Sequence, residues 1–273
     1  MKKRNLVLSV MTTCLVSCFL LSGCNGQKQI DSETVKTVKV EEQAHLQDDT
    51  VSPACKITID YSYLAESDAA DSIAQRINRT IQAHVLGKEY IRMNPEVAVD
   101  SFKNTYINNY RKDVNEFYQE DIKNGTPKDE LPTWYNYEYG LTTHFSEGKE
   151  GILNFIAETF EYTGGAHPNS WNKWMNFEQN TGKLLALKDV FMAGSEKPMS
   201  DMLLEELITE MATRLEDSSI TSLEGLQNAG ILNSTNMYVP DNFLLEKEKV
   251  SFLYNKYDIA PYAVGIITLS LPY

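Results

Sequence analysis

The hydrophobic pattern becomes regular near residue 56, where apolar residues from Ile57 to Tyr63 alternate with polar ones. A period of two is typical of a strand with one face on a core and the other in water. The preceding segment, Asn25 to Thr50, is polar, poor in aromatic residues and without apolar periodicity. Such a segment buries too little surface to offset its ordering entropy, so the sequence predicts a flexible tether over residues 24–50.

Two helices are expected next. In the first, Ser67 can cap the N-terminus, and apolar residues from Ile73 to Val85 recur every fourth position until Gly87 ends the pattern. The second is expected to begin at Asn94-Pro95 and to end at Asn124-Gly125. One side of it is apolar and largely aromatic, with Val99, Phe102, Tyr106, Tyr110, Val114 and Phe117. This stripe predicts core packing on a sheet rather than ligand binding.

Beyond Trp134 the pattern favours strands joined by turns. The expected strands are 134–139 continuing to 142–145, then 152–162, 171–177, 184–187, 243–245, 250–254 and 265–271. A further helix is expected around 198–215, and residues 218–234 carry weaker helical signals.

The turn after the strand that ends at Tyr162 has an unusual composition, because two adjacent glycines are followed by a His-Pro step. Gly164 and Gly165 can adopt backbone angles that other residues avoid, and Pro168 holds His167 in an extended conformation. We therefore expect an exposed corner that presents His167 to solvent.

The first residues have the features of an export signal. A basic head, Lys2 to Arg4, precedes an apolar stretch from Leu6 to Leu21 that is too short and too interrupted to favour a permanent span. Leu21-Ser22-Gly23-Cys24 resembles the bacterial lipobox, which implies a signal peptide over residues 1–23 and lipid, such as palmitate, on Cys24. The protein would then be held on the extracytoplasmic side of a membrane in the bacterial cell envelope. An uncleaved anchor and a soluble secreted protein are the alternatives.

The net charge of the chain narrows the class of partner. Loss of residues 1–23 lowers Lys+Arg from 25 to 22 against 38 Asp+Glu, so the net charge moves from −13 to about −16. An acidic surface repels phosphate backbones, which argues against nucleic acid as a partner, and attracts cationic proteins, although the charge also keeps the protein soluble.

After export and lipidation Cys55 would be the single free cysteine, so we expect no intramolecular disulfide and a small buried residue at Cys55.

The sequence contains no familiar catalytic motif. His45, His84, His144 and His167 are scattered, with no zinc-type histidine pair, no nucleophile elbow and no glycine-rich phosphate loop. We therefore expect no enzymatic activity, no metal and no cofactor. A hydrolase whose site residues are distant in sequence is the remaining alternative.

Two blocks together resemble the RsiV-like C-terminal domain, a domain of unknown function. Residues 161–168, with Asn176-Phe177, Thr181-Gly182-Lys183 and Asp189-Val190-Phe191, resemble its start, and residues 250–265 resemble its end. The part before them is similar, more loosely, to the N-terminal module found in PdaC-type deacetylases. The expected organisation is a PdaC-type module over residues 51–159 and an RsiV-like domain over residues 160–273.

The resemblance implies an α+β fold with helices packed on antiparallel sheets, in two lobes of similar size. RsiV-type relatives are anti-sigma factors whose outer domain binds lysozyme, so it also implies a non-catalytic binding module for lysozyme or another cationic envelope protein. This chain carries a lipobox in place of their transmembrane helix, and it has no deacetylase domain. Binding of peptidoglycan or another glycan is the second hypothesis.

If the glycine corner and residues 259–263 meet at one end of a sheet, they would form a rigid patch able to stack on sugars or anchor a protein. The expected binding residues are Tyr162, Gly164, Gly165, His167, Tyr257, Pro261 and Tyr262. The alternative is that both segments are turns fixed by glycine and proline, with tyrosines that close the core.

Overall fold

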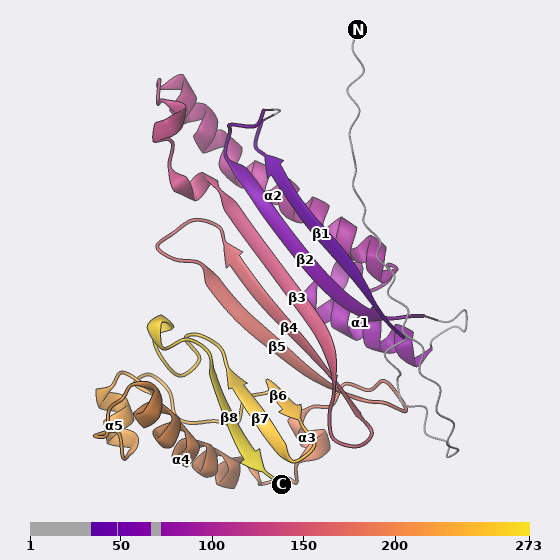
Figure 1. Cartoon of the computed structure of the whole chain (residues 1–273), viewed down its shortest axis with the longest axis vertical. Helices are drawn as coiled ribbons and strands as arrows, with labels where there is room; N and C mark the ends of the chain where they lie inside the picture. The colour runs from indigo at the N-terminus through magenta and orange to yellow at the C-terminus, as the bar shows by residue number, and fades with distance from the viewer. Residues whose placement is uncertain (1–33, 48, 67–71) are drawn as a thin grey trace.

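The structure, a computed structural model, describes residues 34–47, 49–66 and 72–273. They form an α+β fold with a five-stranded sheet, a three-stranded sheet and helices packed on both, which confirms the expected fold class (Figure 1). Within these ranges no helix combines the length and hydrophobicity needed to cross a bilayer. The expected signal peptide and Cys24 lie outside the described residues.

The larger sheet has the strand order of the sequence. Its strands are β1 (Val35–His45), β2 (Ala54–Leu64), β3 (Tyr137–Glu147), β4 (Ile152–Tyr162) and β5 (Asn169–Glu178). All neighbours pair antiparallel except β2 and β3, which run parallel with Cys55 opposite Tyr137. The expected antiparallel pairing therefore fails at this one pair, because the chain between β2 and β3 is a helical crossover, the connection that a parallel pair requires.

Strand β1 overturns part of the predicted tether. Residues 35–45 pair along their whole length with β2, from Val35 opposite Leu64 to His45 opposite Ala54. Val38 and Val40 pack partly against the core, while most of the other side chains are exposed. A sheet-edge strand is held mainly by backbone hydrogen bonds, which leave little trace in the side-chain pattern, and so its polar sequence resembled a tether.

Two helices form the crossover and cover one face of the larger sheet (Figure 1). Helix α1 (Ile73–Val85) is capped by Ser72, whose Oγ accepts a hydrogen bond from the Gln75 backbone at 3.3 Å; the expected cap, Ser67, lies outside the described residues. Helix α2 (Pro95–Lys123) begins at the predicted cap, with Asn94 Oδ1 accepting from the Glu96 N–H at 3.0 Å. Single 3₁₀ turns lie at Lys88–Tyr90 (η2), Lys128–Glu130 (η3) and Thr133–Tyr135 (η4).

The aromatic stripe of α2 is core, as predicted. The rings of Phe102 and Tyr106 lie 5.3 Å and 4.9 Å from that of Tyr139 on β3, and Tyr110 is buried. Phe117 is the exception, since it is half exposed and contacts Trp134 at a ring distance of 5.6 Å. Cys55 is fully buried, as expected, and burial raises the pKa of its thiol to about 12, so the reactive thiolate is scarce at neutral pH.

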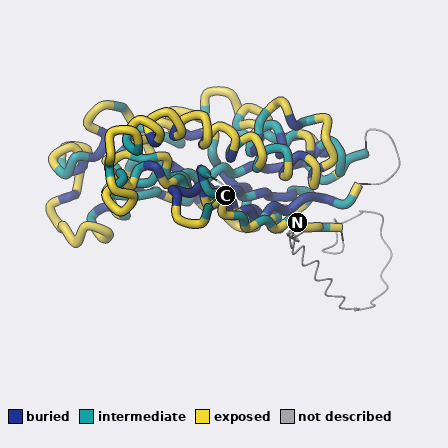
Figure 2. The backbone as a smooth tube through the Cα atoms, turned by 90° about the horizontal axis from the view of Figure 1, so that it is seen from above, coloured by how far each residue is buried: buried dark blue, intermediate teal, exposed yellow. Residues whose placement is uncertain are grey.

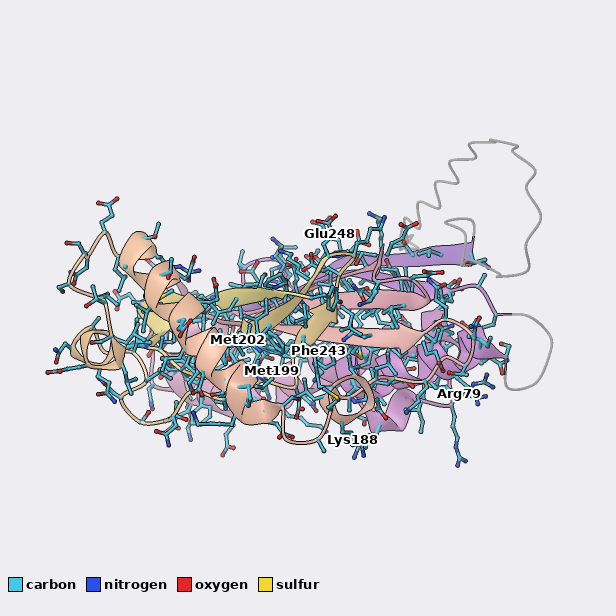
Figure 3. All side chains as sticks on the ribbon, turned by 90° about the horizontal axis from the view of Figure 1, so that it is seen from below. Arg79, Lys188, Met199, Met202, Phe243 and Glu248 are labelled. Atoms are coloured by element: carbon cyan, nitrogen blue, oxygen red, sulfur yellow. The ribbon has the colours of Figure 1, made fainter. Side chains whose placement is uncertain are left out.

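The second unit follows β5. It contains α3 (Leu187–Val190), α4 (Glu196–Arg214), α5 (Leu223–Asn228), β6 (Phe243–Leu245), β7 (Lys249–Tyr254), η5 (Tyr262–Val264) and β8 (Ile267–Pro272). Its three strands pair antiparallel in the order β6-β7-β8. The strand expected over residues 184–187 is reduced to one bridge between Phe177 and Leu184. Met199 of α4 packs partly against this unit's core, whereas Met202 is largely exposed (Figure 3).

Each unit has its own buried core, and the buried residues run through the middle of the molecule (Figure 2). The first core extends to Met175 and Phe177 on β5, and the second gathers apolar residues from α4 and β6–β8. The predicted boundary between residues 159 and 160 falls inside β4, so it is misplaced. The larger sheet continues to Glu178 before the second unit begins.

Asparagine side chains join the two units along the outer edge of β5. Asn176 donates from Nδ2 to the Phe243 carbonyl and accepts at Oδ1 from the Leu245 N–H, both at 2.8 Å. Asn242 accepts from the Trp174 N–H at 2.7 Å and donates to the Asn172 carbonyl at 2.8 Å. A side-chain amide carries a donor and an acceptor like the backbone, so Asn242 occupies part of the edge of β5 without adding a strand, and Asn176 holds β6 against β5.

Candidate functional site

The glycine corner has the shape that the sequence predicts. Gly164 and Gly165 have φ values of 90° and 98°, in the region that favours glycine. A Cβ at Gly164 would lie 3.1 Å from the Cβ of Trp134, so both the backbone angle and the space require glycine. Tyr162 donates its hydroxyl to the Gly165 carbonyl at 3.2 Å and braces the corner. His167 is exposed at its tip.

The second corner follows β7 and begins with a tight turn. The Asn255 N–H donates to Asp258 Oδ2 at 2.7 Å, and the Asp258 N–H donates back to the Asn255 carbonyl at 3.1 Å. Tyr257 within this turn has φ 71°, a rare conformation for a large side chain, and it is 61% exposed. Such local strain is characteristic of functional sites.

The two corners meet, as predicted, in what we call the aromatic cluster: His167, Tyr257 and Tyr262. The His167 imidazole stacks on Tyr262, with ring centroids 3.8 Å apart and planes inclined by 22°. Tyr262 donates its hydroxyl to the Pro168 carbonyl at 2.7 Å, which ties the corners together. Lys256 places its Nζ 4.3 Å from the centre of the Tyr262 ring, a cation–π contact.

The hydrogen bonds of His167 select one tautomer of the neutral imidazole. Its Nδ1 lies 3.1 Å from the Pro168 carbonyl, which can only accept, so Nδ1 carries the proton. Nε2 is then the acceptor for the Tyr257 hydroxyl, 3.2 Å away. In the described part of the chain no hydrogen bond joins His167 to a carboxylate, and the cluster presents flat rings with polar edges.

The remaining predicted residues have supporting positions. Pro261 is exposed and precedes η5, which begins at Tyr262, while Tyr162, Gly164 and Gly165 shape the first corner. The alternative, that the tyrosines close the core, does not fit Tyr257, which is mostly exposed. It fits Tyr262 in part, since that ring is half-buried. Whether the cluster binds a partner stays a prediction.

Beside the cluster lies a cleft of about 300 Å³, which we call the junction cleft. Its lining is His84, Trp171, Asn172, Lys173, Tyr238, Pro240, Asp241, Asn242, Leu253, Asn255 and Asp258. Sequence reasoning missed it, because its walls come from α1, β5 and two segments of the second unit that share no local motif. The turn that presents Tyr257 to the cluster also supplies Asp258 to the cleft.

The other histidines stand apart from the cluster. His45 is not solvated in a tether but bonds through Nδ1 to the Ser52 carbonyl at 2.8 Å, beside the loop after β1. His84 bonds to the Thr80 carbonyl at 2.8 Å near the end of α1, and His144 is exposed on β3. Among the described residues, no three His, Cys, Asp or Glu side chains are grouped in a way that suits a metal ion.

Comparison with known families divides the chain in two. Residues 50–170 match the family model described as deacetylase PdaC, and residues 188–273 match the model described as a protein of unknown function, DUF3298. The two matched regions are separated by residues 171–187, which include most of β5 and the segment that leads to α3. None of the curated proteins matches the chain.

Two solved structures are similar over most of the chain. A member of the DUF3298 family from Bacteroides fragilis has 30% identity and a TM-score of 0.77, over 88% of this chain and 90% of that one. A DUF3298 family protein from Pseudomonas aeruginosa has 17% identity and a TM-score of 0.57, with the same coverage. The second similarity supports the fold alone.

Proposed function

The chain belongs to the DUF3298 family of proteins of unknown function, and from this premise we propose that it is a non-catalytic binding module of the bacterial cell envelope. The observation that carries the proposal is the aromatic cluster, in which one mostly exposed tyrosine and one exposed histidine are held at the meeting point of two braced corners. Rigid, exposed aromatic side chains are frequent anchors of protein interfaces, because little conformational entropy is lost when they are covered.

The partner that we propose is a cationic envelope protein, with lysozyme as the first candidate. The resemblance to RsiV-type domains suggests lysozyme, and an excess of 38 acidic over 25 basic residues favours a cationic partner. Such a negative charge raises the rate at which a cationic protein associates, while most of the binding free energy comes from a few buried anchor residues.

Tyr257→Ala is expected to weaken lysozyme binding by about tenfold or more, because loss of an aromatic anchor costs roughly 1.4 kcal/mol or more. The affinity of the full chain can be measured by isothermal titration calorimetry. Tyr273→Ala is a matched control, because Tyr273 is about half exposed and its hydroxyl also makes a hydrogen bond, to the Glu246 carbonyl. Tyr273 follows β8 and lies at the opposite end of β7 from Tyr257, away from the aromatic cluster. Equal loss in both variants, or none in Tyr257→Ala, would contradict the role of the cluster.

A glycan is the second candidate partner, and the stacked pair of His167 and Tyr262 favours it because flat rings pack well on sugar faces. Salt separates the two candidates. Binding of lysozyme should weaken steeply as salt rises through the physiological range, whereas stacking on a neutral peptidoglycan fragment should barely change. If neither ligand binds the full chain, the proposed function is wrong.

We also propose that lipid on Cys24 anchors the protein to a membrane, on the evidence of its first residues, Lys2 to Cys24. Cys24→Ser is expected to release the protein from the membrane fraction and to abolish incorporation of labelled palmitate in bacteria. Cys18→Ser, within the apolar stretch, is the control and should change neither result. Unprocessed full-length protein in the cytosol would refute the anchor.

A further inference from the structure

We propose that the junction cleft is a saccharide-binding site, in which a sugar ring packs on Trp171 and its hydroxyl groups bond to the surrounding side chains. This site is separate from the aromatic cluster, and it does not depend on a protein partner. The cleft lies where the first residues of β5 meet residues 238–242 and 253–258 of the second unit, with His84 at its border. Ligand sites are frequent where two structural units meet.

The size of the cleft suits a small polar ring. Its volume is about 300 Å³. This is at the lower end of the range for ligand pockets. A larger hollow of about 430 Å³ near Leu46 and α2 is lined mainly by polar and charged side chains, among them Arg111, Lys112 and Glu116, and has no aromatic wall.

The walls of the cleft are held in place without a ligand. Asn255 accepts from the Asn172 N–H at 2.7 Å and donates to the Asn172 carbonyl at 3.1 Å. Asn242 donates to the same Asn172 carbonyl and accepts from the Trp174 N–H of β5. Each amide donates one hydrogen bond to the backbone of β5 and accepts one from it, which fixes the position of both side chains. A preformed cleft loses little entropy on binding.

The aromatic walls have different environments. Trp171 is half-buried and Tyr238 is 38% exposed. Tyr238 packs edge-on against Tyr254 at a ring distance of 5.5 Å, and its carbonyl accepts the Tyr254 hydroxyl at 2.6 Å. Burial, and secondarily the Asp258 carboxylate, raises the pKa of the Tyr238 phenol, so its hydroxyl remains a hydrogen-bond donor at neutral pH.

The polar groups provide both donors and acceptors. In the described part of the chain, the side chains of Lys173 and Asp241 make no hydrogen bond or ion pair. Asp258 uses Oδ2 within its own turn and has Oδ1 available. The carboxylates of Asp241 and Asp258 and the ammonium of Lys173 together give the cleft a small negative net charge. This charge disfavours binding of a phosphate and is too small to bind a metal cation strongly. A neutral ligand with many hydroxyl groups and one flat apolar face satisfies all of these groups together.

The test uses the ¹⁵N-labelled full chain, whose three tryptophans give separate indole N–H signals in nuclear magnetic resonance spectra. Each signal is assigned by single Trp→Phe variants. Titration with a trimer of N-acetylglucosamine, and separately with cellotriose, to about 10 mM would detect even millimolar binding. We expect the Trp171 signal to shift, and the Trp134 signal to remain in place.

Asp241→Ala is expected to weaken saccharide binding about tenfold, because it removes an exposed acceptor without disturbing any described hydrogen bond. Asp129→Ala, at an exposed carboxylate on η3, is the matched control and should bind like the unmodified chain. Trp171→Phe, which preserves an aromatic ring in β5, should weaken binding while its thermal unfolding stays close to that of the unmodified chain.

Three results would overturn the proposal: neither sugar moves the Trp171 signal, Asp241→Ala binds sugar normally, or a lysine-rich peptide shifts Trp171 where both sugars fail. The last result would assign the cleft to a cationic side chain. Tyr257 does not line the cleft, so the two proposals can be tested separately. The chain can bind saccharide in the cleft without binding lysozyme, and it can bind lysozyme without binding saccharide in the cleft.

Discussion

A fragment that begins at Val51 is expected to lose at least about 5 kcal/mol of unfolding free energy relative to one that begins at Asn25, a loss comparable with the whole stability of many domains. The shorter fragment lacks β1, which pairs with all of β2. Buried residues of β2 such as Ile57 and Ile59 would then lie on an unprotected edge strand whose backbone groups have lost their partners. Urea unfolding followed by circular dichroism measures the difference.

The same comparison tests the correction of the predicted tether. If residues 35–45 were only a spacer, both fragments would unfold at the same urea concentration and with the same slope. Amide hydrogen exchange gives a second readout, since loss of β1 should remove protection from β2 before it affects β4, two strands further along the sheet. Equal protection of β2 in both fragments would contradict the assignment of β1 as a structural strand.

Asn176→Ala is expected to destabilise the protein by about 2–6 kcal/mol, since it leaves one buried carbonyl and one buried N–H without partners at about 1–3 kcal/mol each. Asn176 is 1% exposed, and both of its bonds at 2.8 Å reach β6 of the second unit. The two units should then unfold in separate steps, because their connection along β5 is weakened. Chemical denaturation monitored by fluorescence and by circular dichroism would show whether the two transitions still coincide.

Asn104→Ala is the matched control for this substitution. Asn104 is exposed on α2 and bonds through Nδ2 to Asp100 at 3.0 Å, so its replacement should change the free energy of unfolding by less than about 0.5 kcal/mol. A loss below about 1 kcal/mol in Asn176→Ala, with a single coincident transition, would show that the asparagine contacts do not hold the units together.

The parts of the fold that could be predicted are those whose causes are local in sequence. Helix α2 begins and ends at the predicted caps because Asn94-Pro95 and Asn124-Gly125 act on their own neighbours. The glycine corner was predictable for the same reason, since Gly164 and Gly165 report their own backbone angles. Strand β1 was missed because its partner lies in another strand and its own side chains are mostly polar.

The site could be predicted only in part, for a related reason. The sequence predicts the contact of His167 with Tyr257 and Tyr262 only if the two corners lie at the same end of a sheet. The junction cleft has no such signature, because Trp171 and Tyr238 are far apart in sequence and each has an ordinary structural explanation. Asn242 and Asn255 likewise resemble common turn residues, and their role as links to β5 depends on tertiary contacts.

The two edges of the larger sheet are protected from aggregation by different chemistry. On the β5 side, side-chain amides occupy the backbone groups that a foreign strand would need. On the β1 side, no strand among the described residues pairs outward, and the strand carries Lys36, Lys39, Glu41 and Glu42. Charged side chains make the addition of an apolar strand unfavourable. Neutralising these four charges is therefore expected to favour the pairing of β1 with a strand of another molecule.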